Sequence, residues 1–181
     1  MELEITQSTP DTVPADRLLR LIFWTSAASR QLRRCLASLA NSAGISDGEL
    51  LTLWLCLGEE GGMVQGELAA ALGVSPAQMS GIVERLRQRG LIEMHRQALD
   101  RRRQVWRGTA AARQVLELLA VPLANLADHL SAQLTTDEQQ TALALGQRLA
   151  AAAEAWPAGI DGNSLGNLAD GSIAGSTRKA A

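Results

Sequence analysis

The sequence predicts a mainly α-helical protein with one small β-hairpin, and three observations support this prediction. The 181 residues include one Phe, no Tyr and four Trp, so leucine and alanine must fill the interior, and these two residues favour helices. Apolar residues recur at helical spacing along most of the chain. Residues 91–107 lose this period and read as two short strands. With 46% apolar and 20% charged residues, the composition fits one globular domain.

Two helices are predicted in the first third of the chain. The first covers 16–39, where leucines lie near helical spacing, and residues 1–15 are expected to form a flexible arm. Ser46 and Glu49 have the spacing of a capping box, in which each side chain accepts a hydrogen bond from the other residue's backbone N–H. This box predicts a second helix that ends near Leu57, and two glycines at 61–62 break the chain after it.

Two short helices joined by a tight turn follow, at 65–72 and 76–89. Gly73 stands where a left-handed residue ends a helix. Ser75 is the expected N-cap of the second helix, with Pro76 at its first position and Gln78 completing another capping box. This arrangement is a helix-turn-helix. On the second helix, one stripe is expected to be buried and consists of Met79, Ile82, Val83 and Leu86. The opposite side is expected to face away from the core and carries Gln78, Ser80, Gly81, Glu84, Arg85 and Gln88.

A hairpin directly follows the helix-turn-helix. Its strands are predicted at 91–96 and 103–107, with an arginine-rich loop at 97–102. A helix-turn-helix followed by such a hairpin is the winged-helix layout, so the predicted fold class is a mainly α winged helix-turn-helix with long N- and C-terminal helices.

Two further helices complete the chain. Thr109 is expected to cap a long helix at 110–130, in which Pro122 should produce a kink because proline removes one backbone hydrogen bond. Thr135 and Glu138 form a capping box ahead of a last helix that ends near residue 155. Residues 156–181 are rich in Gly, Ser and Asn and are expected to form a disordered tail.

The basic residues are unevenly distributed, although the net charge is only −2. Residues 85–107 contain eight arginines against Glu93 and Asp100, which gives this segment a charge near +6. Lys179 is the single lysine of the chain. Arginine binds phosphate through a forked guanidinium and enters narrow grooves, so the segment is predicted to bind nucleic acid. A solvated charged face is the alternative interpretation.

Several classes of protein are excluded by the same reasoning. No stretch of about 18 to 20 uninterrupted apolar residues suggests a membrane span, and a cytoplasmic protein is expected. Cys35 and Cys56 lack metal-binding spacing, and His95 and His129 are too scattered for a zinc site, so neither a metal nor a cofactor is predicted. No nucleophile, base and orienting acid can be assembled, which disfavours an enzyme.

From about residue 49 to residue 112 the sequence resembles the MarR family of winged-helix transcriptional regulators. The stretches that carry the resemblance are QGELAAALGVSPAQMSGIVERLRQRGLIE and DRRRQVWRGT. Asp100 and Arg102 match the Asp-x-Arg of the family's wing, and Thr109 matches the threonine after it. The chain departs from the family pattern at Gly81, Met94, Gly108, Ala112 and Val64.

The resemblance implies a homodimer on double-stranded DNA, with a DNA-binding lobe at about 46–108 and dimerisation helices at about 16–40 and 110–155. The recognition helix at 76–89 would enter the major groove. Ser75, Gln78 and Ser80 would meet base edges or adjacent phosphates there, and Arg85 would contact a phosphate or read a base. In the wing, Arg102 would enter the minor groove with Asp100 orienting it, while phosphates would be contacted by Arg101 and Arg103.

The resemblance also implies regulation by a small molecule or a thiol. Relatives release DNA when a small lipophilic or phenolic effector binds between the dimer helices and the DNA-binding lobe, and others respond to oxidation. Phe23, Trp24 and Trp54 are candidate pocket residues, although simple core packing is the favoured alternative for them. Cys35, which follows two arginines, is a candidate sensor, but an ordinary thiol is largely protonated at neutral pH.

Three classes of function follow from the sequence. The leading hypothesis is a dimeric transcriptional regulator that binds a pseudopalindromic duplex, with a repressor favoured over an activator. The alternative is a winged-helix protein-interaction module without sequence-specific DNA binding. An enzyme is the least favoured.

Overall fold

The computed structural model describes residues 14–96 and 104–156. These residues form a winged helix-turn-helix with long flanking helices, which confirms the predicted fold class. The chain divides into two compact units, Met1–His129 and Leu130–Ala181. The elements, in chain order, are α1 Pro14–Ser42, α2 Asp47–Gly58, α3 Gln65–Leu72, α4 Pro76–Gln88, β1 Ile92–Arg96, β2 Gln104–Gly108, α5 Ala110–Ser131 and α6 Thr136–Glu154.

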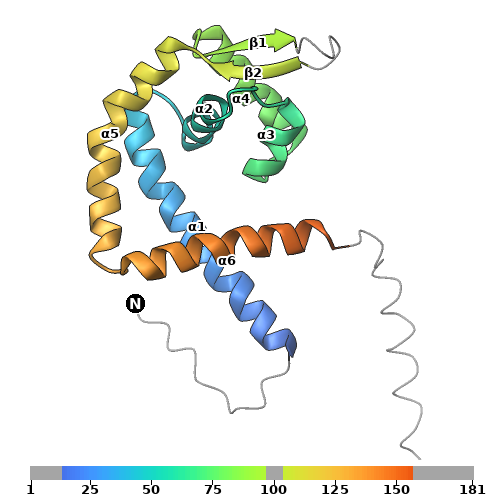
Figure 1. Ribbon diagram of the computed structural model, residues 1–181, viewed down its shortest axis with the longest axis vertical. Coiled ribbons are helices and arrows are strands. Elements are labelled where there is room, and N and C mark those ends of the chain that lie inside the picture. The colour runs from blue at the N-terminus through green and yellow to red at the C-terminus, as the bar shows by residue number, and fades with distance from the viewer. Residues whose placement is uncertain (1–13, 97–103, 157–181) are drawn as a thin grey trace, which may run out of the picture. The chain divides into compact units, whose positions relative to one another are not determined.

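The core of the first unit is built around α2. Figure 1 shows α2 lying between α3, α4 and the hairpin, and its side chains at Leu53 and Cys56 are buried. The predicted stripe of α4 is buried as well, as are residues of α3 and β1. The largest fully enclosed side chains of this core are Leu53, Leu68, Met79, Leu86 and Ile92. Leucine and methionine therefore fill the core volume that aromatic residues fill in many proteins.

The helix boundaries agree with the sequence prediction to within about three residues, because their caps are local. Ser46 and Ser75 make their predicted capping boxes. Gly73 has φ 65°, and the hydrogen bonds from Gly73 N–H to Ala70 O and from Val74 N–H to Ala69 O end α3 in a Schellman motif. The first helix is longer than predicted, because Pro14 is tolerated in a first turn and the helix ends only before Gly44.

The wing is a two-stranded antiparallel sheet in which Met94 pairs with Trp106. A backbone bridge from Met63 to Trp106 ties the hairpin to the segment before α3. Gly108 explains one departure from the family pattern, because a Cβ there would lie 2.5 Å from two Leu57 side-chain carbons. Thr109 begins α5 as expected, since its hydroxyl donates to the Gly90 carbonyl at 2.8 Å and accepts from a backbone N–H of the first turn.

The helix α5 continues through Pro122, and Figure 1 shows it changing direction along its length. Ala112 and Leu119 anchor it in the core, while Leu118 and Val121 are exposed. By length and composition α5 could cross a membrane, although polar residues interrupt its apolar sequence, as predicted. One such helix is weak evidence for a membrane span, since the core helix of a soluble protein passes the same test.

The second unit contains α6, which begins at its predicted cap. The Thr135 hydroxyl and the Glu138 carboxylate make the reciprocal bonds of a capping box. The Thr135 N–H and hydroxyl bonds to the Glu138 carboxylate hold the pKa of that group below its ordinary value. None of the described residues of α6 is buried, although its apolar positions include Leu143 and Leu149.

Gly62 gives a direct test of the packing between the wing and the turn before α3. It has φ 75°, and a Cβ on it would lie 2.9 Å from the Trp106 carbonyl oxygen. We expect Gly62→Ala to lower the free energy of unfolding by about 1–3 kcal/mol, through backbone strain and overpacking. Denaturant unfolding measures this loss. Gly58→Ala is the control, since nothing lies within 4 Å of its added Cβ, and an equal loss in both variants would contradict the explanation.

Candidate nucleic-acid interface

The helix-turn-helix presents the first turn of α4 on its surface. Ser75 Oγ accepts from Gln78 N–H at 3.2 Å, and Gln78 Oε1 accepts from Ser75 N–H at 3.0 Å. Ser80 lies two residues beyond Gln78 on α4 and is also exposed. The structure thus brings three predicted DNA-contacting residues, Ser75, Gln78 and Ser80, together at the start of one helix.

Gln65, which the sequence did not single out, joins this group. It is the first residue of α3, and its Nε2 donates to Ser80 Oγ at 2.8 Å. The bond links the two helices of the motif on their exposed side. The N-cap position before it is Val64, which has no hydroxyl, and only the reverse half of a capping box forms there, from Val64 N–H to Glu67 Oε2 at 3.0 Å.

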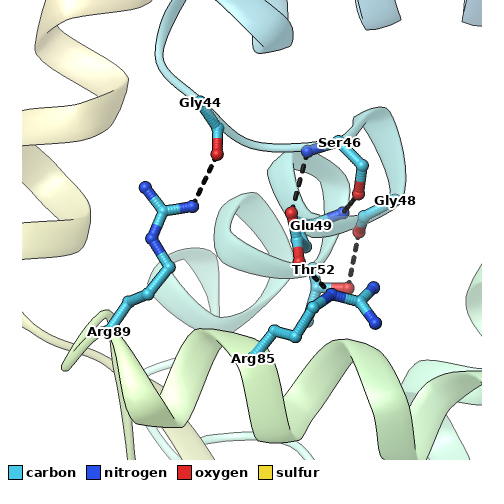
Figure 2. A network of polar contacts seen from close by, with 7 residues as sticks. All are labelled: Gly44, Ser46, Gly48, Glu49, Thr52, Arg85 and Arg89. Carbon is cyan, nitrogen blue, oxygen red and sulfur yellow. Dashed lines mark hydrogen bonds and ion pairs between the residues drawn. The ribbon is translucent and has the colours of Figure 1, made fainter.

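The position of α4 depends on a buried carboxylate in α2. Glu49 has a side chain only 7% exposed, and its Oε1 accepts from Arg85 Nε at 2.6 Å. Its Oε2 accepts from Ser46 N–H at 2.8 Å, so one carboxylate joins the cap of α2 to the recognition helix (Figure 2). Nearby, Arg89 donates to the Gly44 carbonyl at 2.7 Å. Arg85 of α4 therefore binds the first turn of α2, and Arg89, just after α4, binds the turn before α2.

These contacts decide the charge state of Glu49. Burial raises the pKa of its carboxyl, while the hydrogen bond from the Ser46 backbone and the Arg85 guanidinium lower it. The lowering effects are larger in sum, and the pKa lies below its ordinary value. The carboxylate is therefore ionised at neutral pH. Because the pKa is depressed in the folded state, the stability that this group supplies is present at neutral pH and is lost as the pH falls below its ordinary range.

Arg85 thus has a structural partner that the sequence did not suggest. Its side chain is 57% exposed, so its terminal nitrogens remain available for a phosphate. Arg87 is paired as well, with both of its bonds going to Glu84, and the hydrogen bonds from Arg87 and Gln88 hold the pKa of Glu84 at about 2. The charge near +6 counted over 85–107 is therefore partly offset, because Glu49 and Glu84, both outside that segment, neutralise two of its arginines.

Charged residues of the wing make contacts of two kinds. Arg107 Nη2 donates to the Gly61 carbonyl at 3.2 Å, which fixes β2 to the loop before α3. On β1, the side chains of Glu93 and His95 lie 2.8 Å apart. The predicted wing residues Asp100, Arg101, Arg102 and Arg103 lie outside the described residues.

Two cavities lie beside α1 and α5 within the first unit. One, of about 270 Å³, is apolar and is lined by Trp54 together with leucines of α1, α2 and α5. The other, of about 480 Å³, is lined by Cys35, Pro122 and Asn125 among others. Phe23 and Trp24 line neither of these two cavities; they pack edge to face on α1 with ring centroids 5.2 Å apart and are exposed.

The two thiols differ in their surroundings. Cys56 is buried on α2, and burial raises its pKa to about 12, so it is inert at neutral pH. Cys35 is exposed at the larger cavity. Of the two, only Cys35 is accessible to an oxidant or an alkylating reagent.

A family model identifies the segment that contains this site. Residues 43–103, which cover α2, α3, α4 and β1, match the model of the MarR family. The match covers this segment and not the whole chain. MarR-family proteins are transcription regulators and not enzymes. A comparison with curated protein sequences finds no match.

Solved structures agree with the MarR-family assignment at the level of the fold. CouR from Rhodococcus jostii, solved with p-coumaroyl-CoA bound, has 18% identity and a TM-score of 0.66, over 86% of this chain and 100% of that chain. BldR from Sulfolobus solfataricus has 22% identity and a TM-score of 0.61, over 76% and 98%. MepR from S. aureus, solved in complex with DNA, has 19% identity and a TM-score of 0.56, over 78% and 99%.

Removal of the Arg85 guanidinium tests the anchor of the recognition helix. We expect Arg85→Met to lower the free energy of unfolding at pH 7 by about 1–2 kcal/mol, less than for a fully buried pair because Arg85 is more than half exposed. Glu49→Gln in the same protein should reduce this loss, since no buried charge then lacks its partner. Denaturant unfolding of the two single variants and the double variant measures the coupling.

Arg87→Met is the matched control for this experiment. Its partner Glu84 is on the surface, so we expect little change in stability. Additive effects of Arg85→Met and Glu49→Gln would contradict the proposed anchor.

Proposed function

We propose that this MarR-family protein is a homodimeric transcriptional repressor that binds a pseudopalindromic DNA duplex. The observation that carries the proposal is the exposed polar start of α4, which its capping box and the Gln65–Ser80 bond hold in place. Gln78 and Ser80 would meet base edges in the major groove. The Arg85 terminal nitrogens and the arginines at 101–103 would contact phosphates, with Asp100 orienting Arg102 in the minor groove.

The exposed apolar residues of the long helices support a dimer. Leu18, Leu19 and Ile22 on α1 are exposed, and Leu118 on α5 is 74% exposed. Large exposed apolar surfaces are rare on monomeric proteins and commonly mark subunit contacts. We propose that helices within 16–40 and 110–155 pair with those of a second copy, outside a DNA-binding lobe at about 46–108. If a second copy covers α5, the apolar composition of this helix is that of a subunit contact in a cytoplasmic protein and not that of a membrane span.

A small apolar effector fits the same arrangement. The cavity at Trp54 lies between α1, α2 and α5, where a bound molecule would bear on both the dimer helices and the DNA-binding lobe. A lipophilic or phenolic molecule has the chemistry of this lining. CouR, a protein of similar fold, was solved with p-coumaroyl-CoA bound, which supports the idea that this fold can hold a ligand.

The salt dependence of DNA binding tests the repressor proposal. Sites are first selected from a random duplex pool, and an inverted repeat with half-sites about one helical turn apart is expected. Binding of the selected duplex is then measured by fluorescence anisotropy at several salt concentrations. If a dimer neutralises roughly eight phosphates, the logarithm of affinity should fall with the logarithm of salt concentration at a slope of about −7. Salt-insensitive binding, or no recovered site, would contradict the proposal.

Sedimentation tests the dimer separately. We expect the wild-type protein to sediment at twice the monomer mass without detergent, and Leu118→Glu to shift it towards monomer because the new charge would be buried in the contact. Ala120→Glu adds the same charge on the other side of α5, where the residue is also exposed, and should leave the mass unchanged. A dimer that survives Leu118→Glu would place the contact elsewhere.

A further inference from the structure

Hydrogen bonds inside the helix-turn-helix use part of the bonding capacity of Ser80. Its hydroxyl donates to the Pro76 carbonyl at 2.9 Å and accepts from Gln65 Nε2 at 2.8 Å. A hydroxyl has one hydrogen and two lone pairs. Ser80 therefore keeps one lone pair, and no hydrogen, for any further partner.

The orientation of the Gln65 amide follows from the same bonds. Because the single hydrogen of Ser80 is given to Pro76, only the NH₂ end of Gln65 can bond to the hydroxyl. Gln65 is half-buried at the start of α3, so its side chain is constrained on the α3 side of the pair. The bond thus fixes which group Ser80 offers to the outside.

Gln78 has the opposite polarity. Its Oε1 accepts the Ser75 N–H, and this assignment is certain because a backbone N–H can only donate. Both hydrogens of the Gln78 NH₂ group are left for a partner beyond the described residues. Two neighbouring side chains on one turn of α4 are therefore set as an acceptor and a donor.

We propose that the bonds to the Pro76 carbonyl and to Gln65 together make Ser80 an acceptor-only reader of the major groove, so that the base beneath Ser80 must donate a hydrogen bond. This inference rests on the proposed DNA-binding function. In the major groove only the amino groups of adenine and cytosine donate. The site should accordingly select adenine or cytosine at one position of each half-site. Gln65 acts through Ser80, which makes it a positioning residue.

The experiment measures base preference position by position. The full-length wild type, Ser80→Ala, Gln65→Leu and the double variant are each titrated against the selected duplex and its single-base-pair substitutions. We expect the wild type to prefer adenine or cytosine at one position by about fivefold, which corresponds to one net hydrogen bond. Ser80→Ala should remove this preference.

Gln65→Leu should reduce the preference at the same position towards unity, because only the Pro76 carbonyl then orients the hydroxyl, which can exchange that bond to donate to a base as well as accept. The double variant should match Ser80→Ala there. Gln88→Leu makes the same change at the end of α4, where the amide bonds to Glu84, and should leave the preference intact. Thermal melts show whether each variant folds, and Gln65→Ala serves if the leucine variant does not.

Three results distinguish failure of the Gln65 and Ser80 assignments from failure of the proposed DNA-binding function. A preference that Gln65→Leu leaves at full strength would overturn the role of Gln65. A Ser80-dependent preference for guanine or thymine would overturn the acceptor-only assignment. If the wild type binds no duplex at all, the proposed function fails first, and the inference fails with it.

Discussion

The buried carboxylate of Glu49 is the interaction on which the recognition surface depends. Its carboxylate accepts one hydrogen bond from a backbone N–H at the cap of α2 and another from a guanidinium of α4. These two bonds fix the position of α4 relative to α2 more specifically than apolar packing does. An ionised group removed from water costs several kcal/mol unless it is paired and hydrogen-bonded. Both conditions are met here, and the geometry of the pair therefore specifies where α4 lies on α2.

This use of charge changes the meaning of the arginine-rich segment. Three arginines at the end of α4 contact a carboxylate or a carbonyl of the protein itself, at Glu49, Glu84 and Gly44. They hold the fold together before they can serve as DNA contacts. The polar side chains at the start of α4 are constrained in the same way, because capping and cross-helix bonds decide which of their hydrogens and lone pairs remain free. The surface is therefore organised in advance of binding.

Much of the fold could be predicted because its signals are local. Capping boxes at Ser46, Ser75 and Thr135, and the left-handed Gly73, set the helix boundaries from four or five adjacent residues. The Glu49–Arg85 pair could not be predicted in this way, since its partners are 36 residues apart and Glu49 already had a local role in its capping box. Gln65 was missed because its partner Ser80 lies 15 residues away in the sequence. The composition of α5 leaves its surroundings open, because composition does not say whether lipid or protein covers an apolar helix.

The central claim is that Glu49 is buried and ionised between Ser46 and Arg85. The most direct measurement is the titration of its side-chain carboxyl by ¹³C NMR in the folded wild-type protein. We predict that the pKa of Glu49 lies below its ordinary value of 4.5, because the two hydrogen-bond donors outweigh the effect of burial. A midpoint above 4.5 would show that burial dominates and that Arg85 does not hold the carboxylate, which would contradict the account.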